Sequence, residues 1–402
     1  MLIQLVGTIL TFAGIGFIGL LIAKRVALPF SLILVLLGFA TSFLLAPLGW
    51  DTGIRANNFQ DLMMFVLLPV LIFEAAFSLN SKKLFKFMPN VLTLATLGLL
   101  ISTVLTALFL FVGIDHAGFP IIAALIAGVV VSATDPVAVV SQLKQMNAPE
   151  DLNVLIEGES LFNDATAIVL FGILLSVALG ASEPSVVGAI GSFLLVFGGG
   201  ILVGALAGFL GAKLIQLIEI NAANATLTTL LLAYGSFYIA EHSLHVSGIV
   251  AVLFAAITFR RFSEDTLRNV HHEVHEIWQF LGSFANIFVF VLLGLVVTLN
   301  MFSEMWIAML LAIVAAFIAR LAAVYCSVWV NHFTIGQSIP AAYPPIMVWG
   351  GLRGAVTIAL VLSLPTELPY WWTIQSIGFG VVLFTLIVQA TTNPLLMRKL
   401  KL

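Results

Sequence analysis

The chain has 402 residues, of which 61% are hydrophobic and only 9% are charged, and its formal net charge is −3. A soluble domain usually carries about 25% charged residues, so a soluble fold of this composition would expose apolar surface to water. The composition therefore indicates an integral membrane protein. No basic tract suggests a nucleic-acid partner. The single cysteine, Cys326, excludes an internal disulfide and a cysteine metal cluster.

Apolar stretches long enough to cross a bilayer recur along the whole chain, and no soluble domain fits between them. A membrane-spanning helix needs about 20 mostly apolar residues. The stretches predict an all-α membrane protein of about thirteen spans, at residues 3–23, 28–47, 60–77, 90–113, 119–143, 153–179, 186–212, 224–240, 246–260, 276–299, 303–330, 343–364 and 373–396.

The basic residues give this arrangement an orientation. Of the 16 lysines and arginines, Arg55 alone falls in an even-numbered loop, and Arg320 and Arg353 lie inside spans. All the others fall in odd-numbered loops or after the last span. Because cytoplasmic loops carry an excess of Lys and Arg, this pattern predicts an N-terminus outside the cell membrane and a cytoplasmic C-terminus.

Six ionisable residues lie well inside the predicted spans, away from their ends: Glu74, Asp135, Glu159, Asp164, Arg320 and Arg353. Each costs about 2.5 to 3.5 kcal/mol at the bilayer centre on insertion scales. Buried ion pairs that only fix helix packing are one explanation. Four acids and two bases leave carboxylates without a partner, however, and this imbalance favours an ion path.

The fifth span contains the sequence Thr134-Asp135-Pro136. Pro136 lacks a backbone N–H, and its ring clashes with the carbonyl four residues earlier, so we expect a break between Ala133 and Asp135. Broken backbone at membrane depth is tolerated only in a protein-lined or water-lined site. The freed carbonyls and the carboxylate are ligands for a small cation, although a simple proline kink is the alternative.

The sixth span places four oxygen-bearing side chains on one side of a helix. Residues four apart share a helical face, so Glu159 stacks with Asn163 and Ser160 stacks with Asp164. The short connection to the fifth span allows this side to face Asp135. A polar seam between two helices is the alternative.

The twelfth span contains a second interruption, Gly350-Gly351-Leu352-Arg353-Gly354. Its place near the end of the chain corresponds to the place of the fifth span in the first half. Paired interrupted helices of this kind indicate the binding site of a secondary transporter.

The chain resembles the monovalent cation:proton antiporter-1 family of the prokaryotic NhaP type, which is related to animal sodium–proton exchangers. The resemblance covers essentially the whole chain. It rests on four motifs that occur in order: Phe73-Glu74-Ala75, Thr134-Asp135-Pro136, Glu159-Ser160 followed by Asn163-Asp164, and Gly351-Leu352-Arg353-Gly354.

The resemblance implies a fold of two inverted six-helix repeats with crossed interrupted helices. Residues 1–87 and 186–299 would form a dimerisation domain, and residues 88–185 and 300–402 would form an ion-transporting core domain. The protein is accordingly expected to be a homodimer in the membrane.

The resemblance also implies residue roles. The sodium ligands would be Asp135, Ser160, Asp164 and the Thr134 backbone. Asn163 would orient its neighbours. The remaining ionisable residues would serve as a structural ion pair (Glu159 and Arg320), as charge compensation at the crossed helices (Arg353) and as part of the access path (Glu74).

These inferences predict exchange of cytoplasmic Na⁺ or Li⁺ for H⁺ by alternating access, without a cofactor or enzyme chemistry. Because Asn163 stands where electrogenic relatives carry a second aspartate, one-for-one electroneutral exchange is expected. A potassium–proton antiporter, a sodium-coupled symporter of an organic anion, a cation channel and a non-transporting sensor are the alternatives. His271, His272 and His275 are expected in a cytoplasmic loop, where they sense pH, bind metal adventitiously or are simply solvated.

Overall fold

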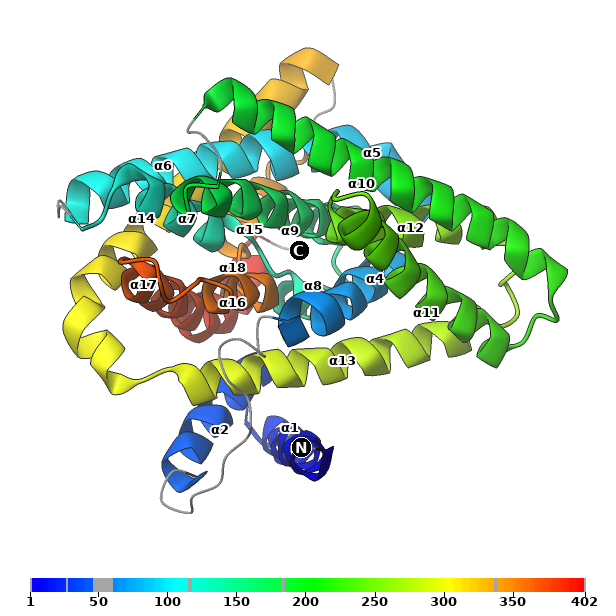
Figure 1. Cartoon of the computed structure of the whole chain (residues 1–402), viewed down its shortest axis with the longest axis horizontal. Helices are drawn as coiled ribbons and strands as arrows, with labels where there is room; N and C mark the ends of the chain where they lie inside the picture. The colour runs from blue at the N-terminus through cyan, green and yellow to red at the C-terminus, as the bar shows by residue number, and fades with distance from the viewer. Residues whose placement is uncertain are drawn as a thin grey trace.

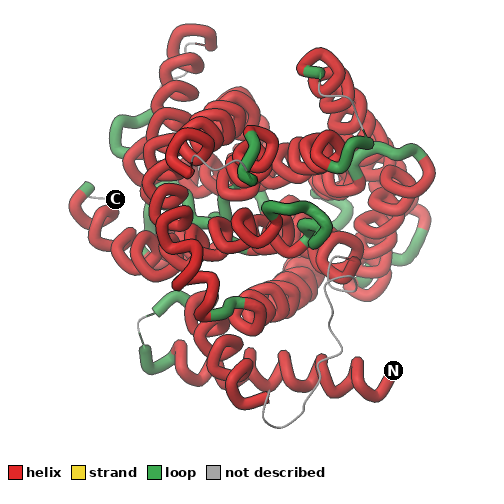
Figure 2. The backbone as a smooth tube through the Cα atoms, turned by 60° about the vertical axis from the view of Figure 1, so that its left-hand side comes forward, coloured by secondary structure: helices red, strands yellow, loops and turns green. Residues whose placement is uncertain are grey.

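A computed structural model describes residues 2–26, 28–45, 61–114, 118–181, 185–335 and 339–400. Within these ranges every regular element is a helix, and short loops join the helices (Figure 2). The all-α prediction is therefore confirmed. Arg55, which was expected in an outer loop, lies outside the described residues.

Every predicted span has a helical counterpart in the structure. The α-helices are α1 (Leu2–Ala23), α2 (Phe30–Leu45), α4 (Leu68–Ser78), α5 (Ser81–Thr93), α6 (Leu99–Ile114), α7 (Ile121–Ser132), α8 (Val137–Gln145), α9 (Glu150–Ala178), α10 (Val186–Leu214), α11 (Ala222–Tyr238), α12 (Gly248–Ser263), α13 (His271–Val296), α14 (Leu299–Ile335), α15 (Tyr343–Trp349), α16 (Ala355–Leu362), α17 (Trp371–Phe384) and α18 (Ala390–Lys399). Short π or 3₁₀ turns extend several of them, at Leu62–Leu67, Leu94–Gly98, Ile215–Leu217, Ile239–Ser243 and Thr385–Gln389.

Among the described residues, 8 continuous helical segments are long and apolar enough to cross a membrane. Two shorter apolar segments, Phe30–Leu44 and Leu62–Ser78, accompany them. The chain is therefore a multi-pass membrane protein, and the count of thirteen crossings stays a prediction.

Two predicted boundaries were wrong. The fourth span begins at Ser81 and not at residue 90, because the Asn80 side chain caps α5 by accepting a hydrogen bond from the Lys83 N–H at 3.3 Å. The histidine cluster, expected in a loop, lies instead on the first turns of α13, which begins at His271. In both places a polar helical end precedes the apolar stretch, so a search for apolar residues alone starts the helix too late.

The helices form two packed groups. In the first, α13 packs along α2 and also contacts α1 and α4, and α12 packs against α10, α11 and α4. In the second, α6 packs on α7 and α14, and α14 packs on α17. Figure 1 shows α1 and α2 on one side of the long helix α13, with α16 and α17 on its other side.

Small residues allow the closest helix contacts. Gly204 and Gly208 of α10 face the backbone of α12, where an added Cβ at Gly208 would lie 2.9 Å from the Phe259 nitrogen. Glycine at every fourth position lets two helix backbones approach closely, which is a common way to join helices in lipid.

Candidate ion-binding site

The first interrupted helix breaks at the position predicted from Pro136. Helix α7 ends at Ser132 and α8 begins at Val137, so the segment from Ala133 to Pro136 interrupts the helix between them. The Asp135 N–H donates a hydrogen bond to the Leu352 carbonyl at 2.9 Å, which ties this break to the second one.

The second break separates α15, which ends at Trp349, from α16, which begins at Ala355. Gly354 lies directly against the Asp135 side chain, and a Cβ at this position would overlap the carboxylate. Glycine is therefore needed here for close approach of the two non-helical segments, and the two interrupted helices cross at Asp135 and Gly354.

At the crossing, the Asp135 carboxylate lies at helix N-termini and the Arg353 guanidinium lies at helix C-terminal ends. The Asp135 carboxylate accepts hydrogen bonds from the Val137 N–H at 3.0 Å and the Ala355 N–H at 3.3 Å, which are the first residues of α8 and α16. The Arg353 guanidinium donates to the carbonyls of Val131 and Gly351, at the ends of α7 and α15. The anion thus lies at two partly positive N-termini and the cation lies beside two partly negative C-terminal ends. The compensating role of Arg353 stays a prediction.

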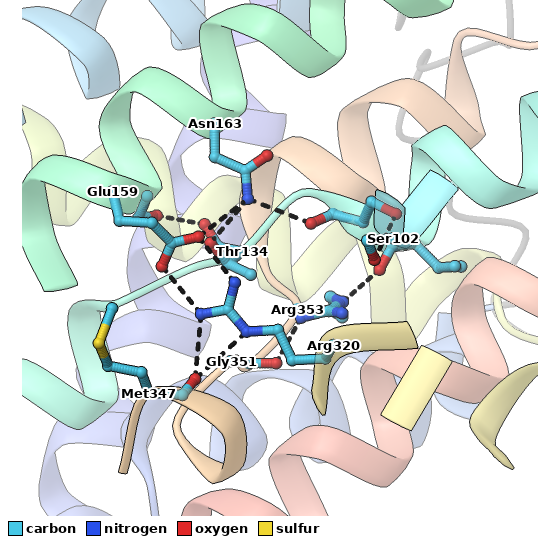
Figure 3. A network of polar contacts seen from close by, with 11 residues as sticks. Ser102, Thr134, Glu159, Asn163, Arg320, Met347, Gly351 and Arg353 are labelled. Carbon is cyan, nitrogen blue, oxygen red and sulfur yellow. Dashed lines mark hydrogen bonds and ion pairs between the residues drawn. The ribbon is translucent and has the colours of Figure 1, made fainter. Parts of the chain in front are cut away.

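Helix α9 supplies the next polar groups. The Ser160 hydroxyl donates to the Thr134 carbonyl, and the Asn163 amide donates to the Ser132 carbonyl and the Thr134 hydroxyl, each at 3.2 Å. The same amide lies 3.3 Å from Glu159 Oε1. Figure 3 shows Asn163 and Glu159 pointing from one helix toward Thr134, so the broken segment of the fifth span is held against α9.

Asp164 and Asn163 each have a buried side-chain oxygen without a hydrogen-bond partner among the described residues, and that of Asp164 belongs to a carboxylate. The Asp164 Oδ1 atom is buried and makes no hydrogen bond within the described part of the chain. The side chain lies within electrostatic reach of Asp135, Glu159 and Arg353. Burying a carboxylate oxygen without a partner is costly, so this oxygen is suited to hold a proton or a small cation.

Glu159 and Arg320 form a buried pair with two nearly parallel hydrogen bonds. The distances from Arg320 Nη1 and Nη2 to Glu159 Oε1 and Oε2 are 2.7 and 2.8 Å, and the two residues are 2% and 7% exposed. Arg320 also donates to the Met347 carbonyl at 3.2 and 3.0 Å. The pair therefore joins α9, α14 and the last turn of α15.

Sequence reasoning missed several partners at this site. The Met347 carbonyl holds Arg320, and the Thr385 hydroxyl accepts a hydrogen bond from the Arg353 N–H at 3.1 Å. The Ser132 hydroxyl donates to Ser102 at 2.9 Å. None of these belongs to a motif.

Glu74 lies apart from the crossing. Its Oε1 atom accepts a hydrogen bond from Ser78 at 3.3 Å, and the Ser78 hydroxyl lies 3.2 Å from His275 Nδ1. The side chain packs against Gly282 of α13. Its role in the access path stays a prediction.

Two cavities lie near the site. One of about 600 Å³ contains Asp135 and Arg353 in its lining and extends to Gln145, the last residue of α8. The other, of about 830 Å³, is lined by residues near the end of α9 and reaches inward as far as Ile168, one turn beyond Asp164. The structure therefore shows a route to Asp135 from one end of the molecule.

Gly354→Ala is expected to abolish ion exchange, because a methyl group there displaces the Asp135 carboxylate from the two helix N-termini. Overpacking of this kind typically costs about 1–3 kcal/mol of stability, so the variant should still fold. The measurement is cation-dependent proton flux in proteoliposomes. Gly235→Ala is the matched control, since an added Cβ on that α11 residue meets nothing within 4 Å; flux equal to this control would contradict the expectation.

Two crossed interrupted helices, with a carboxylate at one break, an arginine at the other and a cavity that reaches the carboxylate, define a secondary transporter. Comparison with known proteins gives the same class. A family model described as "Sodium/hydrogen exchanger, transmembrane" matches residues 7–399. The chain therefore belongs to the sodium/hydrogen exchanger family, which confirms the resemblance seen in the motifs.

Individual relatives cover most of the chain. It is 34% identical over 378 residues to the Na(+)/H(+) antiporter ApNhaP of Aphanothece halophytica, covering 93% of this chain and 70% of that protein. It is 31% identical to the Na(+)/H(+) antiporter NhaP of Pseudomonas aeruginosa, covering 86% and 83%. The solved structure of the sodium proton antiporter MjNhaP1 from Methanocaldococcus jannaschii has the same fold, with a TM-score of 0.83, 99% coverage of each chain and 21% identity.

Proposed function

We propose that this chain is a secondary active antiporter that exchanges cytoplasmic Na⁺ or Li⁺ for H⁺. The observation that carries the proposal is the buried Asp164 oxygen, which makes no hydrogen bond within the described residues and lies near Asp135 at the crossing of two broken helices. Relatives named as Na(+)/H(+) antiporters support the same ions. No cofactor and no enzyme chemistry are proposed, since the ions are the cargo.

Coupling follows from competition for one set of oxygens. The proposed sodium ligands are the carboxylates of Asp135 and Asp164, the Ser160 hydroxyl and the Thr134 carbonyl. Two carboxylates near each other in a poorly hydrated site bind either a cation or a proton, and not both at once. The site without either carries uncompensated charge, which is costly to move through hydrocarbon, so only a loaded site crosses.

Movement is assigned to the two parts that the family fold implies. The core domain, residues 88–185 and 300–402, moves against the dimerisation domain, residues 1–87 and 186–299, which joins two copies into a homodimer. The predicted orientation supports a cytoplasmic opening for the Asp135 cavity, because Ala23 and Gln145 in its lining adjoin loops that are predicted to be cytoplasmic. The N-terminus is then outside and the C-terminus inside.

The test is a flux assay on purified protein in liposomes that carry an acid interior and an internal pH dye. Sodium, lithium, potassium and choline are added outside in turn. The proposal expects the interior to become more alkaline with sodium or lithium. A response to potassium alone would make the protein a potassium–proton antiporter, and no response to any cation, with folded protein, would favour a symporter of an organic anion.

The exchange is expected to be electroneutral, because Asn163 leaves one fewer titratable group beside Asp164. Steady exchange in ion-tight vesicles should therefore not change when valinomycin and a potassium gradient impose a membrane potential. Measurement of sodium-driven proton flux at several clamped potentials checks this. A rate that rises or falls steadily with voltage would show that net charge moves in each cycle.

A further inference from the structure

The cavity that reaches Asp135 has two walls of different origin. One wall comes from the proposed core domain and includes Asp135, Gln142 and Thr391. The facing wall comes from α1, α2 and α13 of the proposed dimerisation domain and is mostly apolar. Its polar side chains in the described structure are Ser31, Ser283 and Asn286.

Asn286 differs from Gln142, the other half-buried amide in the lining of this cavity. Gln142 is already engaged, since its Nε2 atom donates to the Ala390 carbonyl at 2.8 Å and its Oε1 atom accepts from Asn393 at 3.0 Å. Asn286 is half-buried and has no hydrogen-bond partner in the part of the chain that the structure describes. Its amide is therefore available to whatever enters the cavity.

A side-chain amide oxygen is a neutral acceptor that can replace one water in the hydration shell of an alkali cation, as carbonyl oxygens do in cation pathways. Sodium that approaches Asp135 through this cavity has to lose part of its hydration shell. A neutral amide in the facing wall offers a partial replacement without holding the ion as strongly as a third carboxylate would.

We propose that Asn286 is an entry ligand for the cation on the cytoplasmic side, a role that rests on the proposed antiport function. Asn286 belongs to α13, whereas Asp135 belongs to the interrupted helix that moves with the core domain. The two residues share a cavity only while the site is open on this side. Asn286 therefore contacts the ion in the inward-open state and loses the contact when the core domain moves.

A role in the inward-open state alone predicts that loss of the Asn286 amide changes the KM for sodium at one face of the membrane and not at the other. Asn286→Leu, which keeps the size and removes the amide, should raise the KM for sodium at the cytoplasmic face about three- to tenfold, as loss of one hydrogen-bond-sized interaction does. The maximal rate should not fall, and the KM at the opposite face should not change. Gln279→Leu is the matched control, because this exposed amide lies on the same helix outside the cavity lining.

The experiment measures sodium-dependent proton flux in inside-out and right-side-out membrane vesicles of the unmodified chain and the two variants. A KM shift confined to inside-out vesicles of Asn286→Leu supports the proposal. An equal shift on both faces, a shift confined to the other face, or no shift overturns it. Absence of flux in the unmodified chain would instead reject the antiport function, so the two failures are distinguishable.

Discussion

Asp164→Asn is expected to reduce exchange to the background of empty liposomes while the protein remains folded. The amide has the size of the carboxylate, but it neither releases a proton nor supplies a negative ligand. Folding should be little affected, because the Asp164 Oδ1 atom makes no hydrogen bond within the described residues that the substitution would break.

Proton flux with sodium and with lithium, together with a thermal unfolding curve, measures the two effects separately. Asp151→Asn is the control on the same helix, because Asp151 is partly exposed and its pairings with Lys83 at 3.4 Å and Lys86 at 3.7 Å are surface contacts, which contribute little to stability. Substantial exchange by Asp164→Asn would reject the assigned role of this carboxylate. Loss of exchange together with loss of folding would point to a structural role.

Glu159→Ala is expected to destabilise the protein strongly. Removing one partner of a buried ion pair costs about 3–5 kcal/mol, because the other charge is left uncompensated. Here the remaining charge would be Arg320, which is 7% exposed and would keep only the Met347 carbonyl as an acceptor. The α9–α14 contact would weaken, and the midpoint of thermal unfolding should fall by several degrees.

Glu150→Ala is the matched control for this variant. The Glu150–Lys83 distance of 2.6 Å is as short as that of the buried pair, but Glu150 is exposed, so its loss should change the midpoint of thermal unfolding little. A second variant, Glu159→Met with Arg320→Met, should recover part of the lost stability, because no buried charge remains. If Glu159→Ala unfolded at the normal temperature but no longer bound sodium, Glu159 would belong among the cation ligands.

The two helix breaks were predictable from the sequence because their causes are local. Pro136 removes a backbone donor, and the glycines around Arg353 weaken the helix wherever the rest of the chain places them. The stacking of Glu159 on Asn163 followed from helical spacing alone. The pairing of Glu159 with Arg320 did not, since the two residues are far apart in sequence, and it came from the family resemblance.

Other parts of the site depend on tertiary packing and left no signal in the sequence. The Met347 carbonyl accepts from Arg320 because α15 ends beside α14, and any residue type would supply that carbonyl. Asn286 faces the Asp135 cavity because of the rotation of α13 against α2. The start of α5 at Ser81 was not predicted, because Lys82 and Lys83 precede its apolar residues and lower the local hydropathy.

Calorimetric titration of the purified protein with sodium tests most directly whether the cation and the proton compete for one site. Titration in two buffers of different ionisation enthalpy, repeated over a series of pH values, gives the number of protons released for each sodium ion bound. Competition at Asp164 and Asp135 predicts a release that approaches one proton per ion as the pH is lowered, and no release from Asp164→Asn. Sodium binding without proton release at every pH would contradict the account.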